Sequence, residues 1–347
     1  MRNHRNTLLA MLLLTLPIWA CASSKVTQDP ADITAPFDGE RFQNLEPFED
    51  KHFGNVLWWQ LKALFYRERW QDVDDQAFYQ PEQARSEPLK VVVINHATVL
   101  IQMNGYNILT DPHFSQRASP IAWAGPRRVV QPAIPFEDLP PIDAVLISHD
   151  HYDHLDVSTL QRLTERDRPV IFAGLGNRAL LEDSGIDRVV EMDWWQTERL
   201  GDLELHMVPV QHWSARGTND RRTTLWGGYV LRGEKQVFFA GDTGYGTGKV
   251  FRMIHERLGD MDLSLIPIGA YLPRQFMRNA HVWPQESVKI HQDVQSAQSI
   301  GIHFGTFYGL TDEAYADPPQ RLKKALLEAG LDEGVFIAPD FGRTYAY

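Results

Sequence analysis

Apolar positions along this chain gather into short runs. From Leu89 onward these runs alternate with polar loops, which is typical of strands in a globular domain. The runs that predict strands are 91–94, 99–103, 107–109, 144–147, 203–210, 236–240, 263–268, 300–303 and 335–338. Two stretches with helical periodicity, 284–298 and 318–329, lie between the later strands. The pattern predicts an α/β fold in which helices cover two sheets.

A different pattern occupies residues 55–70, where apolar side chains recur at helical spacing. The residues of this predicted amphipathic helix that share one face are Leu57, Leu61, Leu64 and Phe65, with Trp58, Trp59 and Trp70 nearby. One interpretation is a helix packed on the core. The other is a surface that touches lipid or guides an acyl chain, with Trp58, Trp59, Leu61 and Phe65 as substrate contacts.

The first residues are typical of an export signal. Arg2 and Arg5 precede an apolar run at 8–16 that is too short to span a bilayer. We predict a signal peptide over 1–20, and Ala20-Cys21 resembles the lipobox of bacterial lipoproteins, with an ordinary cleaved signal as the alternative. Residues 21–54 then form a polar, lipid-anchored linker, and 55–347 form the domain. Because Ala22 stands where inner-membrane lipoproteins carry aspartate, the resemblance predicts the outer membrane of a bacterial envelope.

Composition and charge limit which kinds of partner and metal site the chain can have. The chain carries 34 basic and 45 acidic residues, a net charge of −11, so its surface repels phosphate backbones and nucleic acid is excluded as a default partner. Cys21 is the one cysteine, so the chain has no intrachain disulfide and no thiolate metal site. Any metal must be held by histidines and carboxylates. Nothing in the pattern indicates the oligomeric state.

The highest density of candidate metal ligands follows the predicted strand 144–147. The segment 148–156 reads Ser-His-Asp-His-Tyr-Asp-His-Leu-Asp. In an extended loop alternate residues face the same way, so His149 and His151 can bind one metal, while Asp153 and His154 turn toward a second. Imidazole and carboxylate ligands suit zinc, and other divalent first-row metals are compatible.

Three later residues complete two coordination shells. His212, Asp242 and His303 each follow an apolar predicted strand, where loops gather at one edge of a sheet. We assign His149, His151 and His212 to one metal, and Asp153, His154 and His303 to the other, with Asp242 bridging. The sequence thus predicts a binuclear, metal-dependent hydrolase in which Asp242 also orients the nucleophilic water.

Further residues are candidates for supporting roles. Metal-binding histidines usually donate their second ring N–H to a carboxylate or carbonyl, and Asp111, at the end of a predicted strand, is our candidate for that partner. His96 has two interpretations, a similar supporting role or a hydrogen bond in the core. Tyr271 either contacts the substrate phosphate or packs.

Several motifs extend beyond the metal loop. They are His96-Ala97-Thr98-Val99, Thr110-Asp111-Pro112, residues 115–120, residues 139–156, Asp193-Trp194-Trp195, Gln211-His212-Trp213, residues 239–245, residues 266–271, His281-Val282 and Gly305-Thr306-Phe307. The metal loop resembles that of the metallo-β-lactamase superfamily. The full set resembles the branch of N-acylphosphatidylethanolamine-hydrolysing phospholipases D.

The resemblance implies an αββα sandwich with two zinc ions at one edge. It implies hydrolysis of N-acylphosphatidylethanolamine-like phospholipids to phosphatidic acid and N-acylethanolamine, and it points to His281 as an active-site residue near the phosphate. The superfamily supports many reactions on one fold, so another phosphodiester or a lactone is the alternative substrate. A nuclease is disfavoured by the acidic charge, and a non-catalytic binding protein by the complete ligand set.

Overall fold

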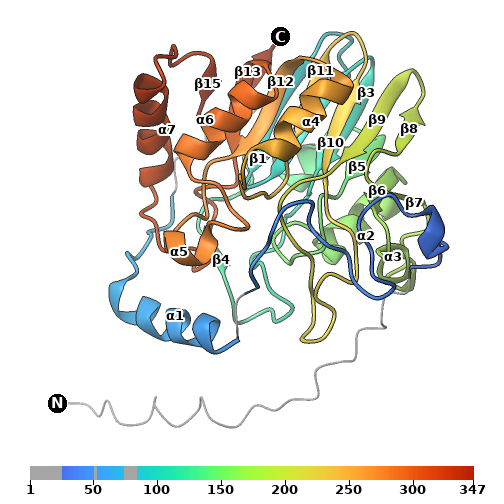
Figure 1. The fold of residues 1–347 in the computed structure, drawn as a ribbon. Helices are drawn as coiled ribbons and strands as arrows, with labels where there is room; N and C mark the ends of the chain where they lie inside the picture. Colours follow the sequence, from blue (N-terminus) through green and yellow to red (C-terminus); the bar gives the residue numbers. More distant parts are fainter. Residues whose placement is uncertain (1–25, 51–52, 74–83) are drawn as a thin grey trace.

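Two mixed sheets, packed face to face and covered by helices on both outer sides, form the body of the protein (Figure 1). The computed structural model describes residues 26–50, 53–73 and 84–347. Each sheet has seven strands and combines an antiparallel part with a parallel part. The predicted αββα sandwich is confirmed.

The first sheet has the strand order β16-β1-β2-β3-β5-β6-β7. Its strands are β16 (Thr344–Ala346), β1 (Lys90–Asn95), β2 (Thr98–Met103), β3 (Tyr106–Thr110), β5 (Ala144–Leu146), β6 (Val170–Gly174) and β7 (Val189–Met192). The second sheet has the order β15-β13-β12-β11-β10-β9-β8. Its strands are β15 (Phe336–Ile337), β13 (Ser296–Ile302), β12 (Met261–Pro267), β11 (Gln236–Phe239), β10 (Gly228–Arg232), β9 (Leu203–Val208) and β8 (Thr197–Leu200). A short ribbon pairs β14 (Phe307–Tyr308) with β4 (Arg127–Arg128).

Helices cover the sandwich because parallel neighbours need crossover connections. On the first sheet these are α2 (Val157–Arg166) and α3 (Arg178–Asp183), and on the second α4 (Lys249–Leu258), α6 (Pro284–Asp293) and α7 (Asp317–Glu328). The other helical segments are α1 (Phe53–Tyr66), α5 (Arg274–Met277), η1 (Pro30–Asp32) and η2 (Phe136–Asp138).

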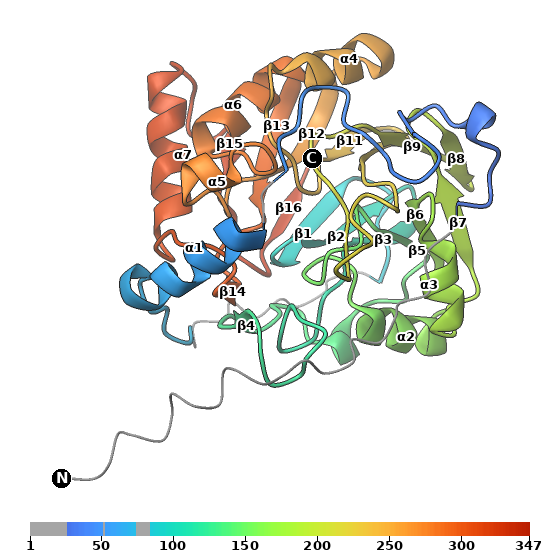
Figure 2. The same cartoon turned by 60° about the horizontal axis from the view of Figure 1, so that its bottom comes forward.

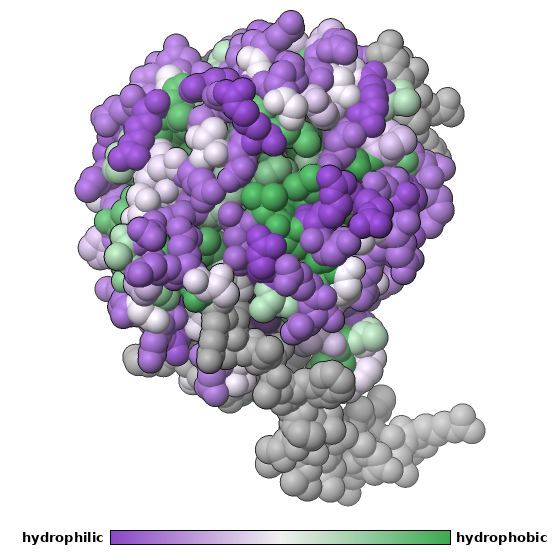
Figure 3. All heavy atoms as spheres, turned by 90° about the vertical axis from the view of Figure 1, so that its right-hand side faces the viewer, coloured by the Kyte–Doolittle hydropathy of each residue, from purple (hydrophilic) through white to green (hydrophobic). Residues whose placement is uncertain are grey.

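Three apolar clusters match this layering. One lies between the sheets, the second between the first sheet and α2 and α3, and the third between the second sheet and α4, α6 and α7. On the face that forms the right-hand side of Figure 1, hydrophilic side chains surround a central apolar area (Figure 3). The predicted strands lie in these layers, and their apolar runs are largely buried, except for the edge strand β15, where Phe336 alone of 335–338 is buried.

One predicted helix is too long. The stretch 284–298 predicts a helix throughout, but α6 ends at Asp293 and the chain has entered β13 by Ser296. Gln295 has a left-handed backbone (φ 49°), which a helix cannot continue. Ser296 then pairs with Met261 of β12, so sheet pairing overrides the helical pattern.

Residues 26–50 differ from an extended tether. Phe42 and Ala35 are buried in the cluster between the sheets, and Asp193 accepts hydrogen bonds from the backbone N–H groups of Thr34 and Ala35. We call residues 26–50 the N-terminal strap. The predicted signal peptide and Cys21 lie outside the described residues.

Helix α1 stands apart from the sandwich, next to α5 (Figures 1 and 2). It is attached by Ala63, which is buried, and by Trp59, whose indole N–H donates to Asp312 and whose ring contacts Phe276 at 5.1 Å. Leu61 and Phe65 are 45% and 83% exposed. These two residues therefore do not pack on the core as one interpretation of the helix expects, whereas the side chains of Leu57 and Leu64 lie outside the described residues. Among the described residues, no helix has the length and apolar character to cross a membrane.

Candidate metal centre

The predicted ligands meet at one edge of the sandwich, where strands of both sheets end. His149 follows β5, His212 follows β9, Asp242 follows β11 and His303 follows β13. His96 follows β1 and belongs to the same assembly. Parallel strands place their carboxyl ends together, so residues far apart in the sequence become neighbours here.

The first group consists of His149, His151 and His212. The Nε2 atom of His149 lies 2.8 Å from Nδ1 of His151, and Nε2 of His212 lies 3.3 Å from the same Nδ1 atom. The three rings meet edge to face, with centroids 4.5 to 5.1 Å apart. This is the set that the sequence assigns to one metal.

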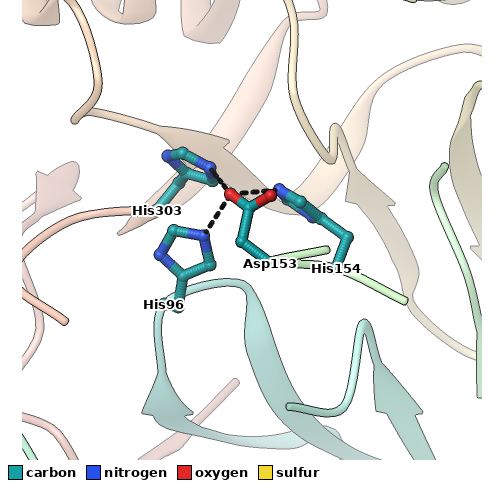
Figure 4. A group of neighbouring side chains, drawn as sticks. All are labelled: His96, Asp153, His154 and His303. Atoms are coloured by element: carbon teal, nitrogen blue, oxygen red, sulfur yellow. Dashed lines mark hydrogen bonds and ion pairs between the residues drawn. The ribbon is translucent and has the colours of Figure 1, made fainter. Parts of the chain in front are cut away.

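The second group consists of His96, Asp153, His154 and His303 (Figure 4). The three histidine Nε2 atoms lie 3.1 to 3.4 Å from Oδ2 of Asp153. Three of these residues are the predicted second set. His96 points into the group instead of lying behind it, and its ring centroid is 3.9 Å from that of His303.

Asp242 lies between the two groups. Its Oδ1 atom is 3.1 Å from Nε2 of His303, and its Oδ2 atom is 3.2 Å from Nε2 of His154. The same Oδ2 atom is 3.9 Å from Nε2 of His149 and 3.8 Å from Nε2 of His212. A carboxylate in this position can bridge two cations, as the sequence predicts.

Partners behind the rings set their orientation. Nδ1 of His154 lies 2.7 Å from Asp111, the carboxylate that the sequence selects for this role, and Nδ1 of His212 lies 2.9 Å from the carbonyl oxygen of Ala280. Ser148 is a partner that sequence reasoning missed: its Oγ atom lies 2.6 Å from Asp111 and 2.9 Å from Nδ1 of His149. In all three rings Nδ1 is engaged and Nε2 faces the cluster, which suits metal binding.

Two rings of the second group, His154 and His303, have raised pKa values, whereas burial lowers the pKa of His96 and of the three rings of the first group. Burial lowers the pKa of His149 and His212 well below the ordinary value and that of His151 to about 3, so these rings are neutral at pH 7. Burial also opposes a charge on His303, but the carboxylates of Asp242 and Asp153 outweigh it and raise its pKa to about 9. The carboxylates therefore make the second group the more attractive to a positive charge.

The donor atoms fit metal ions. Nε2 of His154, Nε2 of His303 and Oδ1 of Asp242 are buried and have no hydrogen-bond partner among the described residues, although they face one another. Unsatisfied buried polar atoms are costly, and a cation held among them satisfies them all. Nitrogen and carboxylate donors without thiolates suit zinc and other first-row divalent metals.

His281 and Trp213 border the first group. Nδ1 of His281 lies 3.7 Å from Oδ2 of Asp242, and its ring is partly exposed, as expected for a residue that reaches substrate. Burial lowers the pKa of His281 to about 4, so the ring is neutral at pH 7. The ring of Trp213 contacts that of His151 at 4.2 Å, and the guanidinium of Arg221 stacks on it at 3.6 Å.

The remaining predicted contacts lie elsewhere. Tyr271 is fully buried and its hydroxyl donates to Asp317 at the start of α7, which matches the packing interpretation and leaves this hydroxyl committed. Trp58, Leu61 and Phe65 lie on the exposed side of α1, and Trp59 lies on its attached side.

Several residues of the centre have left-handed backbones. The φ angles are 43° for His96, 36° for Asp111 and 59° for His303. The carbonyl oxygen of His96 accepts a hydrogen bond from the backbone N–H of His303 at 2.7 Å, so two such turns are joined directly. Non-glycine residues adopt this conformation rarely, and it is often found at functional sites.

Known proteins share this architecture. Residues 106–304 match the model of the Beta-lactamase superfamily domain. The chain is 37% identical over 265 residues to N-acyl-phosphatidylethanolamine-hydrolyzing phospholipase D 1 of Caenorhabditis elegans. This match covers 73% of the present chain and 74% of the worm protein. It is 33% identical over 251 residues to the mitochondrial N-acyl-phosphatidylethanolamine-hydrolyzing phospholipase D of Saccharomyces cerevisiae, covering 70% of this chain and 53% of that protein. The solved structure of Igni18, a metallo hydrolase from the archaeon Ignicoccus hospitalis, matches this chain with a TM-score of 0.56 at 19% identity. The match covers 75% of this chain and 98% of Igni18. At this identity the likeness shows the fold alone.

Proposed function

This chain belongs to the metallo-β-lactamase superfamily and is a metal-dependent hydrolase, and from this premise we propose that it hydrolyses N-acylphosphatidylethanolamine-like phospholipids. In this reaction water adds to phosphorus and the bond from phosphorus to the ethanolamine oxygen breaks. The products are phosphatidic acid and an N-acylethanolamine. The two phospholipase D relatives support this substrate class.

The observation that carries the proposal is the position of Asp242 between two complete ligand groups. Two zinc ions held there would supply Lewis acidity, which lowers the pKa of a water and neutralises charge on phosphoryl oxygens. Asp242 and Asp153 offset the positive charge of the centre from buried positions. Because His281 is neutral at pH 7, its part is to donate a ring N–H hydrogen bond to the departing oxygen rather than to act as a charged acid.

A lipid substrate is supported by the surface of α1. Trp58, Leu61, Phe65 and Tyr66 expose 45 to 83% of their surface. On the other side of the helix, Trp59 packs on Phe276 of α5, and the chain reaches His281 shortly after α5 ends. An apolar surface one helix away from the phosphate-binding edge suits the acyl chains of a substrate whose headgroup reaches the metals.

We further propose that the protein acts at a membrane. The predicted lipid on Cys21 would hold it at the outer membrane of a bacterial envelope, beside such a substrate. The exposed apolar side chains of α1 would add to that anchoring by contacting the same membrane surface.

Product analysis by mass spectrometry tests the reaction. The zinc-loaded full chain, in detergent, is given N-acylphosphatidylethanolamine, with Asp242→Asn as the inactive control. We expect phosphatidic acid and N-acylethanolamine from the wild type only. Cleavage of a simple phosphodiester or a lactone, with the lipid left intact, would reject the lipid substrate and favour the alternative hydrolase.

A matched pair of surface variants tests the lipid surface. Phe65→Glu places a charge on α1, and Leu327→Glu places the same charge on a similarly exposed apolar position of α7 (83% and 77% exposed). We expect Phe65→Glu to lower turnover of vesicle-bound substrate while leaving a short-chain soluble analogue unaffected, and Leu327→Glu to change neither. Equal behaviour of the two variants on vesicles would remove α1 from the proposal.

A further inference from the structure

The N-terminal strap makes direct contact with the segment that carries His212. The side-chain amide of Asn44 donates from Nδ2 to the carbonyl oxygen of His212 at 2.8 Å, and its Oδ1 atom accepts from the backbone N–H of His212 at 3.0 Å. The two residues are 168 positions apart in the chain. The strap, blue in Figure 1, thus reaches the edge of the sandwich at which the ligands gather.

This pair of hydrogen bonds constrains His212 more than either bond alone would. One planar amide holds both polar groups of a single residue, much as a neighbouring strand does in a sheet, so it limits sliding and rotation of that residue. The ring of His212 is held by its Nδ1 contact with Ala280, and Nε2 then faces the first group. With both backbone and ring held, the direction of the Nε2 lone pair is set before a metal arrives.

Neighbouring strap residues hold the other loops of the same edge. The side-chain amide of Gln211 donates to the carbonyl oxygen of Pro47 at 3.2 Å, and the backbone N–H of Thr247 donates to the buried carboxylate of Glu46 at 2.8 Å. The side-chain amide of Asn279 donates to the carbonyl oxygen of Glu49 at 3.3 Å. These three contacts reach the loops that carry His212, Asp242 and His281.

We propose that Asn44 is a positioning residue of the metal centre. Through its amide, the strap sets the place of His212 in the first group, so a segment that the sequence pattern marks as linker becomes part of the ligand framework. The inference rests on the metal-dependent chemistry of the site and does not require the lipid substrate. A metal-binding measurement therefore tests it separately from the proposed reaction.

The test uses three variants of the full chain. Asn44→Ala removes both hydrogen bonds. Asn44→Ser keeps a small polar group that cannot span both partners. Gln43→Ala is the matched control, because Gln43 lies in the same strap but its side chain contacts Asp38 and Arg222 instead of a metal ligand.

Cobalt and zinc affinities are measured by competition with a chromophoric chelator, together with the visible spectrum of the cobalt form. We expect Asn44→Ala to weaken one of two binding steps by about 10-fold or more and to change the cobalt spectrum, as loss of an orienting partner does. Asn44→Ser should weaken the same binding step. Gln43→Ala should leave both binding steps and the cobalt spectrum unchanged.

Wild-type affinity and spectrum in Asn44→Ala would overturn the proposal, whatever its melting temperature, because the strap would then stabilise the fold without positioning the ligand. If Asn44→Ala does not fold, the same readings of Asn44→Ser decide the question.

Discussion

The two ligand groups of the metal centre differ in charge and in support. The first group is three neutral imidazoles, held from behind by a serine hydroxyl, a backbone carbonyl and the amide of Asn44. The second contains the carboxylate of Asp153 and has the carboxylate of Asp111 behind His154. Negative charge attracts a cation over distance, while a neutral ligand binds well only when its lone pair is aimed correctly. The second group should therefore bind a metal more tightly, and the first should depend more on its orienting partners.

Stepwise removal of the metals compares the groups directly. We expect chelator titration to remove one ion first, from the first group, and to abolish turnover when both ions are gone. Because metal binds the folded state, its removal should also lower the melting temperature. Inductively coupled plasma mass spectrometry combined with thermal unfolding follows both effects. A single step that releases both ions together would show that the groups do not differ in affinity.

Asp242→Asn should have the largest effect of any single substitution, because this carboxylate faces both groups. Amide for carboxylate removes the one negative charge that both groups share, so we expect both affinities to fall and turnover to drop by more than about 100-fold, beyond the loss typical of an orienting partner. Asp262→Asn, at a carboxylate that pairs with Lys235 away from the centre, is the matched control. If Asp242→Asn weakened the binding of only one metal, Asp242 would be a ligand of one group and would not bridge the two.

Asp111→Asn should act on the second group. The change keeps the shape but removes the negative charge behind His154, so we expect turnover and the affinity of the tighter step to fall by about 10–100-fold. Steady-state kinetics and chelator competition give the two values. A loss confined to the weaker step would contradict the assignment of Asp111 to the second group.

Ser148→Ala should have the smallest effect and should act on the weaker step. The variant removes the hydroxyl beside Nδ1 of His149, while the backbone N–H of residue 148 still donates to Asp111. Asp111 also loses the hydroxyl but keeps this N–H, so we expect the effect to come from the lost hydrogen bond to His149, a loss of about 1 kcal/mol in binding of the weaker metal. Chelator competition resolves a change of this size. An equal change in both steps would mean that Ser148 supports the centre as a whole.

Local spacing made much of this centre predictable. The segment 148–156 places four donors within a few residues, and His212, Asp242 and His303 each follow an apolar run, so strand ends could be recognised one by one. The alternation of strands with helices predicted two sheets covered by helices for the same reason. In each case the information is carried by residues close together in the sequence.

The strap and α1 were harder to predict. The side chain of Asn44 contacts the backbone of His212 across 168 positions, and no periodic pattern in the sequence predicts such a contact. Phe42 is buried but stands among polar residues, so its segment has the composition of a linker. In α1 the helical period was correct, but periodicity cannot say whether an apolar face meets protein or remains exposed, as Leu61 and Phe65 do. For His96 the sequence left two interpretations open, a supporting role or a hydrogen bond in the core, because the direction of its ring depends on a left-handed turn between β1 and β2 that the pattern does not show.

The left-handed backbones have a consequence for protein engineering. A non-glycine residue in this conformation costs about 1–3 kcal/mol when the conformation is strained. Glycine at His96, Asp111 or His303 would relieve that strain but would also leave a cavity and unpaired partners in a buried centre, so these three positions offer no stabilising route. Arg168 and Gln295 also have left-handed backbones, at 53° and 49°, and belong to neither ligand group. Glycine at these two positions offers up to about 1 kcal/mol each, a stabilising route that leaves every metal ligand in place.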